Sequence, residues 1–207
     1  YRTQSFLESG FFNTLRQTKI SYALCLTLFL FNGIIFSNNL QKFPKGRKNM
    51  LTIDKIFHAS LVLKDIIRPT PLARAYGFTK DFTLYFKPEN LQRTGSFKLR
   101  GSGYKIAMLS DEEKAKGVIA CSAGNHAQGV ALAASKCGIS SLICLPENAP
   151  LSKVEATKGF GADVCLVPGV YDDAYRKALE LKEEHGYTFV HPFDDENVIA
   201  GQGTIGL

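Results

Sequence analysis

The sequence predicts an α/β protein built on a parallel sheet whose two faces are covered by helices. Four short apolar runs rich in β-forming residues alternate with helical patterns along the second half of the chain: GVIACSA, SLICLP, ADVCLVP and TFVHP. This alternation is typical of βαβ units. The runs are almost continuously apolar, as expected of strands buried on both faces. A composition of 45% hydrophobic and 21% charged residues agrees with a globular protein.

The first 49 residues differ from the rest of the chain. Residues 20–36, ISYALCLTLFLFNGIIF, carry no charge, and basic residues lie on both sides of them. One interpretation is a membrane or signal-like stretch. The other is translated sequence upstream of a true start at Met50, and MLTIDKIFHAS, an ordinary protein beginning, favours it. Because the chain begins with Tyr1 and ends on AGQGTIGL, we also expect it to be a piece of a longer protein.

After Met50, the elements are predicted in order from their periodicity and breakers. Apolar residues at helical spacing from Ile53 to Leu63 predict a helix, with Thr52 as its cap. The segment RPTPL ends it. The alternating FTLYF predicts a strand that ends before Pro88, and a helix is expected over 97–109.

Three further helices are predicted between the apolar runs. The first covers 126–137 and is stopped by a glycine. The second covers 152–158 and is opened by a capping box formed by Ser152 and Glu155. The third covers 171–185 and is again stopped by a glycine.

The distribution of charge argues against a nucleic-acid partner. The formal net charge is +6, but residues 1–49 hold seven of the basic residues and one acidic residue, so the rest is neutral overall. The five cysteines are scattered without CxxC pairs, which fits reduced thiols in a cytoplasmic protein, several of them in strands. They do not cluster with the four histidines, so no metal site is expected.

The stretch RTGSFKLRG places Lys98 at the mouth of a predicted helix, between Phe97 and a leucine. A surface lysine whose stem lies along apolar neighbours is one interpretation. The other is a nucleophilic amine, because burial and the positive end of a helix both disfavour the ammonium form. A free amine condenses with carbonyl groups to form Schiff bases, and Phe97 offers an apolar face to a flat ring.

The stretch CSAGNHAQG follows the predicted strand VIA, at the place where open α/β sheets bind ligands. Its small residues predict a turn, and the exposed N–H groups of the next helix would suit a carboxylate or phosphate. Many such turns contain Ser, Gly and Asn only to form the turn, so the interpretation as an anion site stays open on these residues alone.

Together, ENLQRTGSFKLRG and ACSAGNHAQGVALAA resemble the serine/threonine dehydratases, pyridoxal-phosphate enzymes of the tryptophan-synthase-β type. PENAPLSKVEATKGFGADV and HPFDDENVIAGQGTIGL resemble them too. The resemblance covers the chain from about Met50 to its last residue and not residues 1–49. It implies a two-lobed α/β fold and the cofactor pyridoxal 5'-phosphate.

The resemblance also assigns roles to residues of the two stretches. Lys98 would carry the cofactor and act in catalysis, with Phe97 beside the pyridine ring. Asn125 would hydrogen-bond the phenolic oxygen of the cofactor. The substrate carboxylate would be bound by the loop of Ser122, Ala123, Gly124, Asn125 and His126.

One departure within this group of enzymes bears on the reaction. The related amino-acid racemases carry a second serine, an acid/base on the opposite face of the substrate, where this chain has Ala123. The resemblance therefore implies a threonine ammonia-lyase that deaminates L-threonine, and also L-serine, to 2-oxobutanoate or pyruvate and ammonia. Serine racemase, another β-eliminating or β-replacing enzyme of the same fold, and a truncated non-catalytic chain are the alternatives.

The resemblance further implies how the chain is divided. A large cofactor domain would be formed by residues 51–112 and 188–207, incomplete here, and a small α/β domain by residues 113–187. The glycine-rich loop for the cofactor phosphate is expected after Leu207, so this piece alone should be inactive. The complete enzyme would be a cytoplasmic homo-oligomer of amino-acid metabolism, with isoleucine biosynthesis as one setting and a degradative role as the other.

Overall fold

The computed structural model describes residues 51–77 and 82–207. The predictions for residues 1–49, including the uncharged stretch 20–36, lie outside the described residues. The described chain divides into two units. One contains a small hairpin in which β1 (Ala73–Ala75) pairs antiparallel with β2 (Leu84–Phe86). The other contains the remaining strands and the α-helices.

The second unit is built around a four-stranded parallel sheet with the order β5-β4-β3-β6. All three strand pairings are parallel. This confirms the α/β class and the parallel sheet predicted from the apolar runs. Its strands are β3 (Val118–Cys121), β4 (Ser141–Pro146), β5 (Asp163–Val167) and β6 (Thr188–Phe189).

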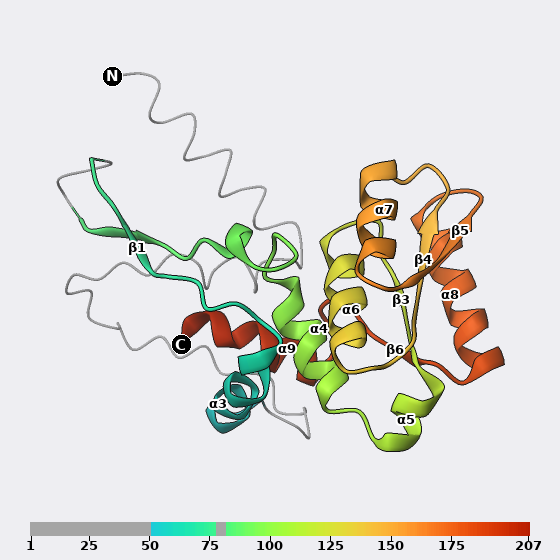
Figure 1. The fold of residues 1–207 in the computed structure, drawn as a ribbon, viewed down its shortest axis with the longest axis horizontal. Coiled ribbons are helices and arrows are strands. Elements are labelled where there is room, and N and C mark those ends of the chain that lie inside the picture. The colour runs from blue at the N-terminus through green and yellow to red at the C-terminus, as the bar shows by residue number, and fades with distance from the viewer. Residues whose placement is uncertain (1–50, 78–81) are drawn as a thin grey trace, which may run out of the picture. The chain divides into compact units, whose positions relative to one another are not determined.

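Helices cover both faces of this sheet, as Figure 1 shows. α8 (Tyr171–His185) packs on one face, while α6 (Asn125–Lys136) and α7 (Leu151–Gly159) lie on the other. All four residues of β3 are buried, which explains its unbroken apolar sequence. The main hydrophobic core lies on the α6 side, and a smaller cluster lies under α8.

Further helices continue the α6 layer away from the sheet. α4 (Lys98–Ala107) packs against α6, and α9 (Glu196–Gly203) packs against α4. α3 (Ile53–Val62) contacts α9. The shorter elements are α5 (Asp111–Lys116), η2 (Leu63–Asp65), η3 (Glu89–Leu91) and η4 (Thr204–Gly206).

Most predicted helices are confirmed, with small shifts at their ends. Thr52 caps α3 by accepting from the backbone N–H of Lys55. α8 has the predicted bounds, and its C-cap Gly186 adopts a left-handed conformation with φ 71°. α4 and α6 begin and end within two residues of the predicted positions.

One local prediction is wrong. α7 begins at Leu151, so Ser152 lies inside the helix, and no side chain caps its N-terminus. The N-cap is Pro150, whose carbonyl accepts from the backbone N–H groups of Lys153 and Val154 at 2.8 and 3.2 Å. The predicted FTLYF strand is present as β2, which pairs with β1 in a two-stranded antiparallel sheet. Alternation of apolar residues identifies a strand but not its partner.

Three cysteines lie in one row across the parallel sheet. Cys121, Cys144 and Cys165 are aligned in the registers of β3, β4 and β5. They belong to the apolar cluster under α8. Burial raises the pKa of Cys121 to about 11 and that of Cys144 to about 12, so both stay protonated thiols. The described cysteines are free, in agreement with the predicted reduced thiols.

Candidate active site

Lys98 is the first residue of α4, and a tight turn places it there. The backbone N–H of Gly95 donates to the carbonyl of Gln92 at 2.8 Å, and Gly95 has φ 70°, a conformation that glycine adopts without strain. Ser96 Oγ then accepts from the backbone N–H of Lys98 at 3.1 Å. The small residues before Lys98 thus form the turn and satisfy the first donor of the helix.

The Lys98 amine is half-buried among neutral groups. Its Nζ donates to the carbonyl oxygen of Pro192 at 2.9 Å and lies 5.4 Å from the centre of the Phe97 ring. Burial lowers the pKa of Lys98 from its ordinary value. Its position at the positive end of α4 acts in the same direction. A larger fraction of neutral, nucleophilic amine follows from this environment.

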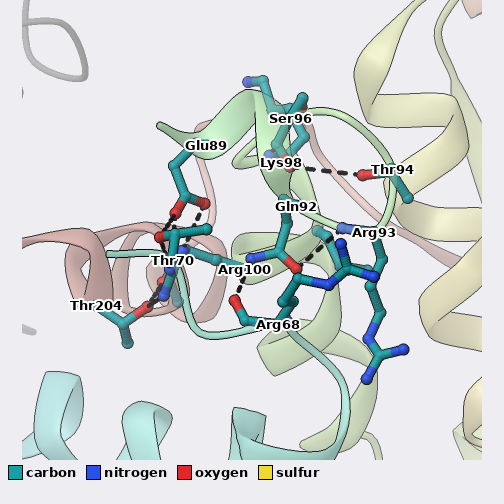
Figure 2. A network of polar contacts seen from close by, with 12 residues as sticks. Arg68, Thr70, Glu89, Gln92, Arg93, Thr94, Ser96, Lys98, Arg100 and Thr204 are labelled. Carbon is teal, nitrogen blue, oxygen red and sulfur yellow. Dashed lines mark hydrogen bonds and ion pairs between the residues drawn. The ribbon is translucent and has the colours of Figure 1, made fainter. Parts of the chain in front are cut away.

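A buried ion pair fixes the first turn of α4. Arg100 donates from Nε and Nη2 to the two carboxylate oxygens of Glu89, each at 2.8 Å, as Figure 2 shows. Thr70 donates to the same carboxylate at 2.6 Å, and Nη1 of Arg100 donates to Thr204 Oγ1 at 3.1 Å. Two-pronged contacts of this kind restrict the guanidinium in angle as well as distance. Arg100 lies two residues after Lys98, so the network ties the start of α4 to three other segments.

Gln92 holds the turn from the other side (Figure 2). Its side-chain Oε1 accepts from the backbone N–H of Arg68 at 2.6 Å, and its Nε2 donates to the Arg68 carbonyl at 2.8 Å. Oε1 also accepts from the N–H of Arg93 at 3.1 Å. One buried amide therefore satisfies backbone groups that would otherwise lack partners.

The second predicted stretch forms the turn from β3 into α6. Ser122 donates its N–H to the carbonyl of Cys144 at 3.2 Å, and its Oγ accepts from the N–H of Gly124 at 3.2 Å. Gly124 is the N-cap of α6 and has no side chain to cap the helix. No acidic residue lies in the first turn, so the exposed N–H groups retain their positive potential. This start of α6 suits an anion.

α6 lies close against the start of α4 because it carries a glycine there. A Cβ built on Gly129 would lie 3.1 Å from the backbone N of Leu99 and from the carbonyl carbon of Lys98. Contacts this short leave little room for any side chain. Gly129 thus brings the first turn of α4, with its lysine, against the N-terminal half of α6.

α9 approaches α4 in the same manner from another direction. A Cβ on Gly201 would collide with the backbone of Arg100 and Gly101. The two helices therefore cross with their backbones in contact, and the crossing lies one turn from Lys98. This glycine belongs to HPFDDENVIAGQGTIGL, one of the stretches that carry the family resemblance.

His126 links α6 to the segment that receives the Lys98 amine. Its Nε2 donates to the carbonyl of Val190 at 2.9 Å, and Nδ1 is buried without a hydrogen-bond partner in the described residues. Burial, with smaller contributions from the Lys98 and His191 charges, lowers the pKa of His126 to about 4. The imidazole is therefore neutral at pH 7. His126 thus holds the carbonyl of Val190, and Lys98 holds that of Pro192.

Asn125 is the first residue of α6, and its side chain is exposed. Its Oδ1 accepts a hydrogen bond from Lys153 Nζ of α7 at 3.3 Å. Ala123, in the turn before it, is half-buried and packs against the main core. The structure places the loop of Ser122, Ala123, Gly124, Asn125 and His126 and the pair of Phe97 and Lys98 at the starts of two helices in contact.

Sequence reasoning missed several residues of this region. Arg100 and Glu89 both lie inside ENLQRTGSFKLRG, and a buried pair of opposite charge was a possible inference from that motif. Pro192 and Lys153 gave no local signal, because their contacts span 94 and 28 residues of sequence.

The described residues contain neither a membrane-spanning helix nor a cluster of metal-binding side chains. No helix within residues 51–77 or 82–207 has the length and apolar character needed to cross a membrane. Within the same residues, no group of three or more His, Cys, Asp or Glu side chains is arranged to hold a metal ion.

Comparison with known proteins defines the class. The family described as "Pyridoxal-phosphate dependent enzyme" matches residues 63–207. The chain belongs to this family, and the predicted cofactor, pyridoxal phosphate, is confirmed with it.

The relatives within the family are more specific. The chain is 51% identical to an L-threonine ammonia-lyase of Thermotoga maritima over 160 residues, which covers 76% of this chain and 40% of that protein. It is 49% identical to an L-threonine dehydratase, catabolic, of Staphylococcus aureus over 162 residues, with coverages of 77% and 47%. The chain therefore spans less than half the length of the curated relatives it matches.

Solved structures agree with this placement. The processed form of threonine deaminase isoform 2 from Solanum lycopersicum matches with a TM-score of 0.68 and 40% identity, covering 75% of this chain and 47% of that chain. Maize serine racemase matches with a TM-score of 0.71 and 36% identity, covering 74% and 47%. The family resemblance and the α/β fold class predicted from the sequence are thereby confirmed.

The residues present fit the cofactor. An aldehyde requires an amine with a lowered pKa, and Lys98 is such an amine. A flat aromatic ring requires an apolar wall, and Phe97 lies directly beside the amine. A phenolic oxygen requires a donor, and Asn125 supplies an exposed amide on the neighbouring helix.

Proposed function

We propose that the protein containing this chain deaminates L-threonine, and also L-serine, to 2-oxobutanoate or pyruvate and ammonia. The observation that carries the proposal is the Lys98 amine. It is half-buried, its pKa is lowered, and it lies at the start of a helix packed against the uncapped start of α6. The relatives named threonine ammonia-lyase and threonine dehydratase support the same reaction.

In this proposal three residues hold the cofactor. Lys98 binds it through the side-chain amine, Phe97 borders its ring, and Asn125 donates to its phenolic oxygen. When bound, pyridoxal phosphate supplies an electron sink for the negative charge that develops at the substrate Cα.

The start of α6 binds the substrate carboxylate. The N–H groups of Ser122 and Gly124 are engaged within the turn, so the carboxylate would accept from the other N–H groups of the loop from Ser122 to His126. They lie at the positive end of the helix, and its first turn has no acidic residue. His126 is neutral and buried, so its role there is to hold the loop against Val190 and not to supply charge.

Lys98 is also the proton carrier. Its free amine would remove the proton from the substrate Cα as general base. The β-hydroxyl would take up a proton and leave as water, and the enamine released would react with water to give the 2-oxo acid and ammonia. Ala123 has no hydroxyl with which to deliver a proton to the opposite face, so elimination is favoured over racemisation.

The experiment is product analysis with the purified full-length protein. With L-serine we expect pyruvate and ammonia, and with L-threonine 2-oxobutanoate. D-serine as the main product would establish the racemase alternative, which the similarity to serine racemase keeps in view. Absence of any product despite bound cofactor would favour a non-catalytic chain.

The metabolic role, location, assembly and domain boundaries of the protein are also part of the proposal. The relative named catabolic favours a degradative role over isoleucine biosynthesis. We propose a cytoplasmic homo-oligomer without a nucleic-acid partner. We also propose that residues 51–112 and 188–207 belong to the cofactor domain and residues 113–187 to the small domain. Limited proteolysis of the full-length protein would test these boundaries.

A further inference from the structure

Lys153 occupies an unusual place on α7. It is the third residue of the helix, and the first turn contains no acidic side chain. A cation is disfavoured at this end by the helix dipole. Its ammonium contacts Asn125, the first residue of α6, which is the positive end of a second helix. Helix stability therefore gives no reason for a lysine here.

The partner of Lys153 is also unusual. Lys105 and Lys116 pair with carboxylates, at 2.8 Å from Asp195 and 2.9 Å from Glu112. Lys153 instead donates to the neutral amide oxygen of Asn125, at 3.3 Å. Lys98 likewise donates to a neutral oxygen, that of Pro192. Lys98 and Lys153 both lie at the candidate site.

The contact determines how the Asn125 amide is oriented. An ammonium group has donors and no acceptor, so only the Oδ1 side of the amide can face Lys153. The NH₂ group must then face away from Lys153. Without a donor-only neighbour, the two orientations of an exposed amide differ little in energy, and the amide presents its oxygen as readily as its nitrogen.

We propose that Lys153 is a positioning residue that fixes the Asn125 amide so that its NH₂ group is presented to the phenolic oxygen of pyridoxal phosphate. This inference rests on the proposed function, because Asn125 is assigned to the cofactor there. Lys153 acts through Asn125 and takes no part in the proton transfers.

The test compares substitutions of Lys153 that differ in hydrogen-bonding character, in the full-length protein. Lys153→Arg keeps a donor-only group, and Lys153→Met removes it. Lys158→Met is the matched control, because Lys158 lies on the same helix, carries the same charge and pairs with the exposed Glu155. Two quantities are measured: the Kd for pyridoxal phosphate, and the pH midpoint at which the visible absorption of the bound cofactor changes.

For Lys153→Met we expect Kd to rise about 3- to 10-fold, the effect of one lost hydrogen bond. The absorption midpoint should move to higher pH, since the phenolic oxygen loses a donor. Lys153→Arg should stay within about 2-fold of the unsubstituted protein, and Lys158→Met should match it. A structural role for Lys153 would leave the absorption midpoint in place.

A double substitution separates positioning from the loss of charge. In an Asn125→Ala background, Lys153→Met should change Kd by less than about 2-fold, because the amide through which it acts is gone. An undiminished effect there, or equal behaviour of Lys153→Met and Lys158→Met, would overturn the inference and leave the proposed function intact. Failure of the unsubstituted protein to bind the cofactor would overturn both.

Discussion

The helices of this protein begin in two different ways. α3, α5, α8 and α9 each carry an acidic residue in the first turn, and side chains of Thr52, Ser110 and Asp195 cap three of them. α4, α6 and α7 carry no acidic residue there, and their N-cap residues provide no side-chain hydrogen bond. The second group contains Lys98, Asn125 and Lys153, the residues of the candidate site.

This difference indicates which helix ends are arranged for stability and which for binding. A carboxylate in the first turn satisfies N–H groups and neutralises the helix dipole. At α6 the positive end of the helix stays available to an anion, and at α4 the positive potential lowers the proton affinity of the Lys98 amine. We infer that the candidate site gives up the stabilisation that ordinary caps provide.

The largest expected effect comes from removing the amine at the start of α4. Lys98→Ala in the full-length protein should lower kcat for L-threonine by about 10⁴-fold, since both the nucleophile and the general base are lost. Formation of 2-oxobutanoate measures it, with the exposed Lys136→Ala on α6 as control. Activity within 10-fold of the unsubstituted protein would show that Lys98 is not the catalytic lysine.

The next largest effect is expected from the buried Arg100–Glu89 ion pair, which holds the start of α4 in place. Arg100→Met leaves the Glu89 carboxylate buried without its guanidinium. Removal of one partner of a buried pair costs about 3–5 kcal/mol. We expect the free energy of unfolding to fall by about this amount in chemical denaturation of the full-length protein. Arg176→Met, which breaks an exposed pair on α8, should change it by less than about 0.5 kcal/mol.

A pH dependence should arise from the buried histidine at the start of α6. The pKa of His126 is about 4 in the folded protein, against about 6.5 when unfolded. The unfolded state binds the extra proton between these values, so stability is complete above pH 6.5 and falls as the pH drops toward 4. The linked loss is about 3 kcal/mol.

His126→Gln should remove this part of the dependence, because glutamine does not titrate. Unfolding free energies measured at pH 7 and pH 4.5 provide the comparison. Burial also lowers the pKa of the nearby His191, so His191→Gln is needed as the parallel variant. Equal pH slopes for His126→Gln and the unsubstituted protein would contradict the assignment.

The smallest effect tests the contrast between the two kinds of helix start directly. Asn125→Asp places a carboxylate in the first turn of α6, which should raise stability by about 0.3–1 kcal/mol. Its affinity for pyridoxal phosphate should fall, since the amide donor is lost. On α8, Asp172→Asn should lower stability by at most about 0.5 kcal/mol and leave cofactor affinity unchanged. A gain of affinity in Asn125→Asp would refute the trade-off.

The local part of this structure was predictable because it depends on neighbouring residues. Helix starts and stops follow from caps and glycines, as at Thr52 and Gly186. The parallel sheet follows from apolar runs that alternate with helical patterns. Lys98 was predicted at the mouth of a helix because small residues precede it.

The sequence gives no signal where a feature depends on residues far apart along the chain. The partner of the LYF strand is set by register with β1, which alternation does not reveal. The Lys98 contact to Pro192 and the Lys153 contact to Asn125 join elements whose separation in sequence carries no local signal. The capping box predicted at Ser152 failed for a local reason, because Pro150 is the N-cap and Ser152 lies inside the helix.

The sequence by itself determined the class of this protein. Its helices and strands follow from propensity and periodicity, and two long motifs in the correct order identify the family. Only the tertiary structure decided the environment of the lysine: the Pro192 carbonyl at its amine, the buried Arg100–Glu89 pair behind it, and the glycine that lets α6 approach. The physical reason is that burial and helix contact arise from packing between distant segments, and the pKa of a side chain follows from that packing.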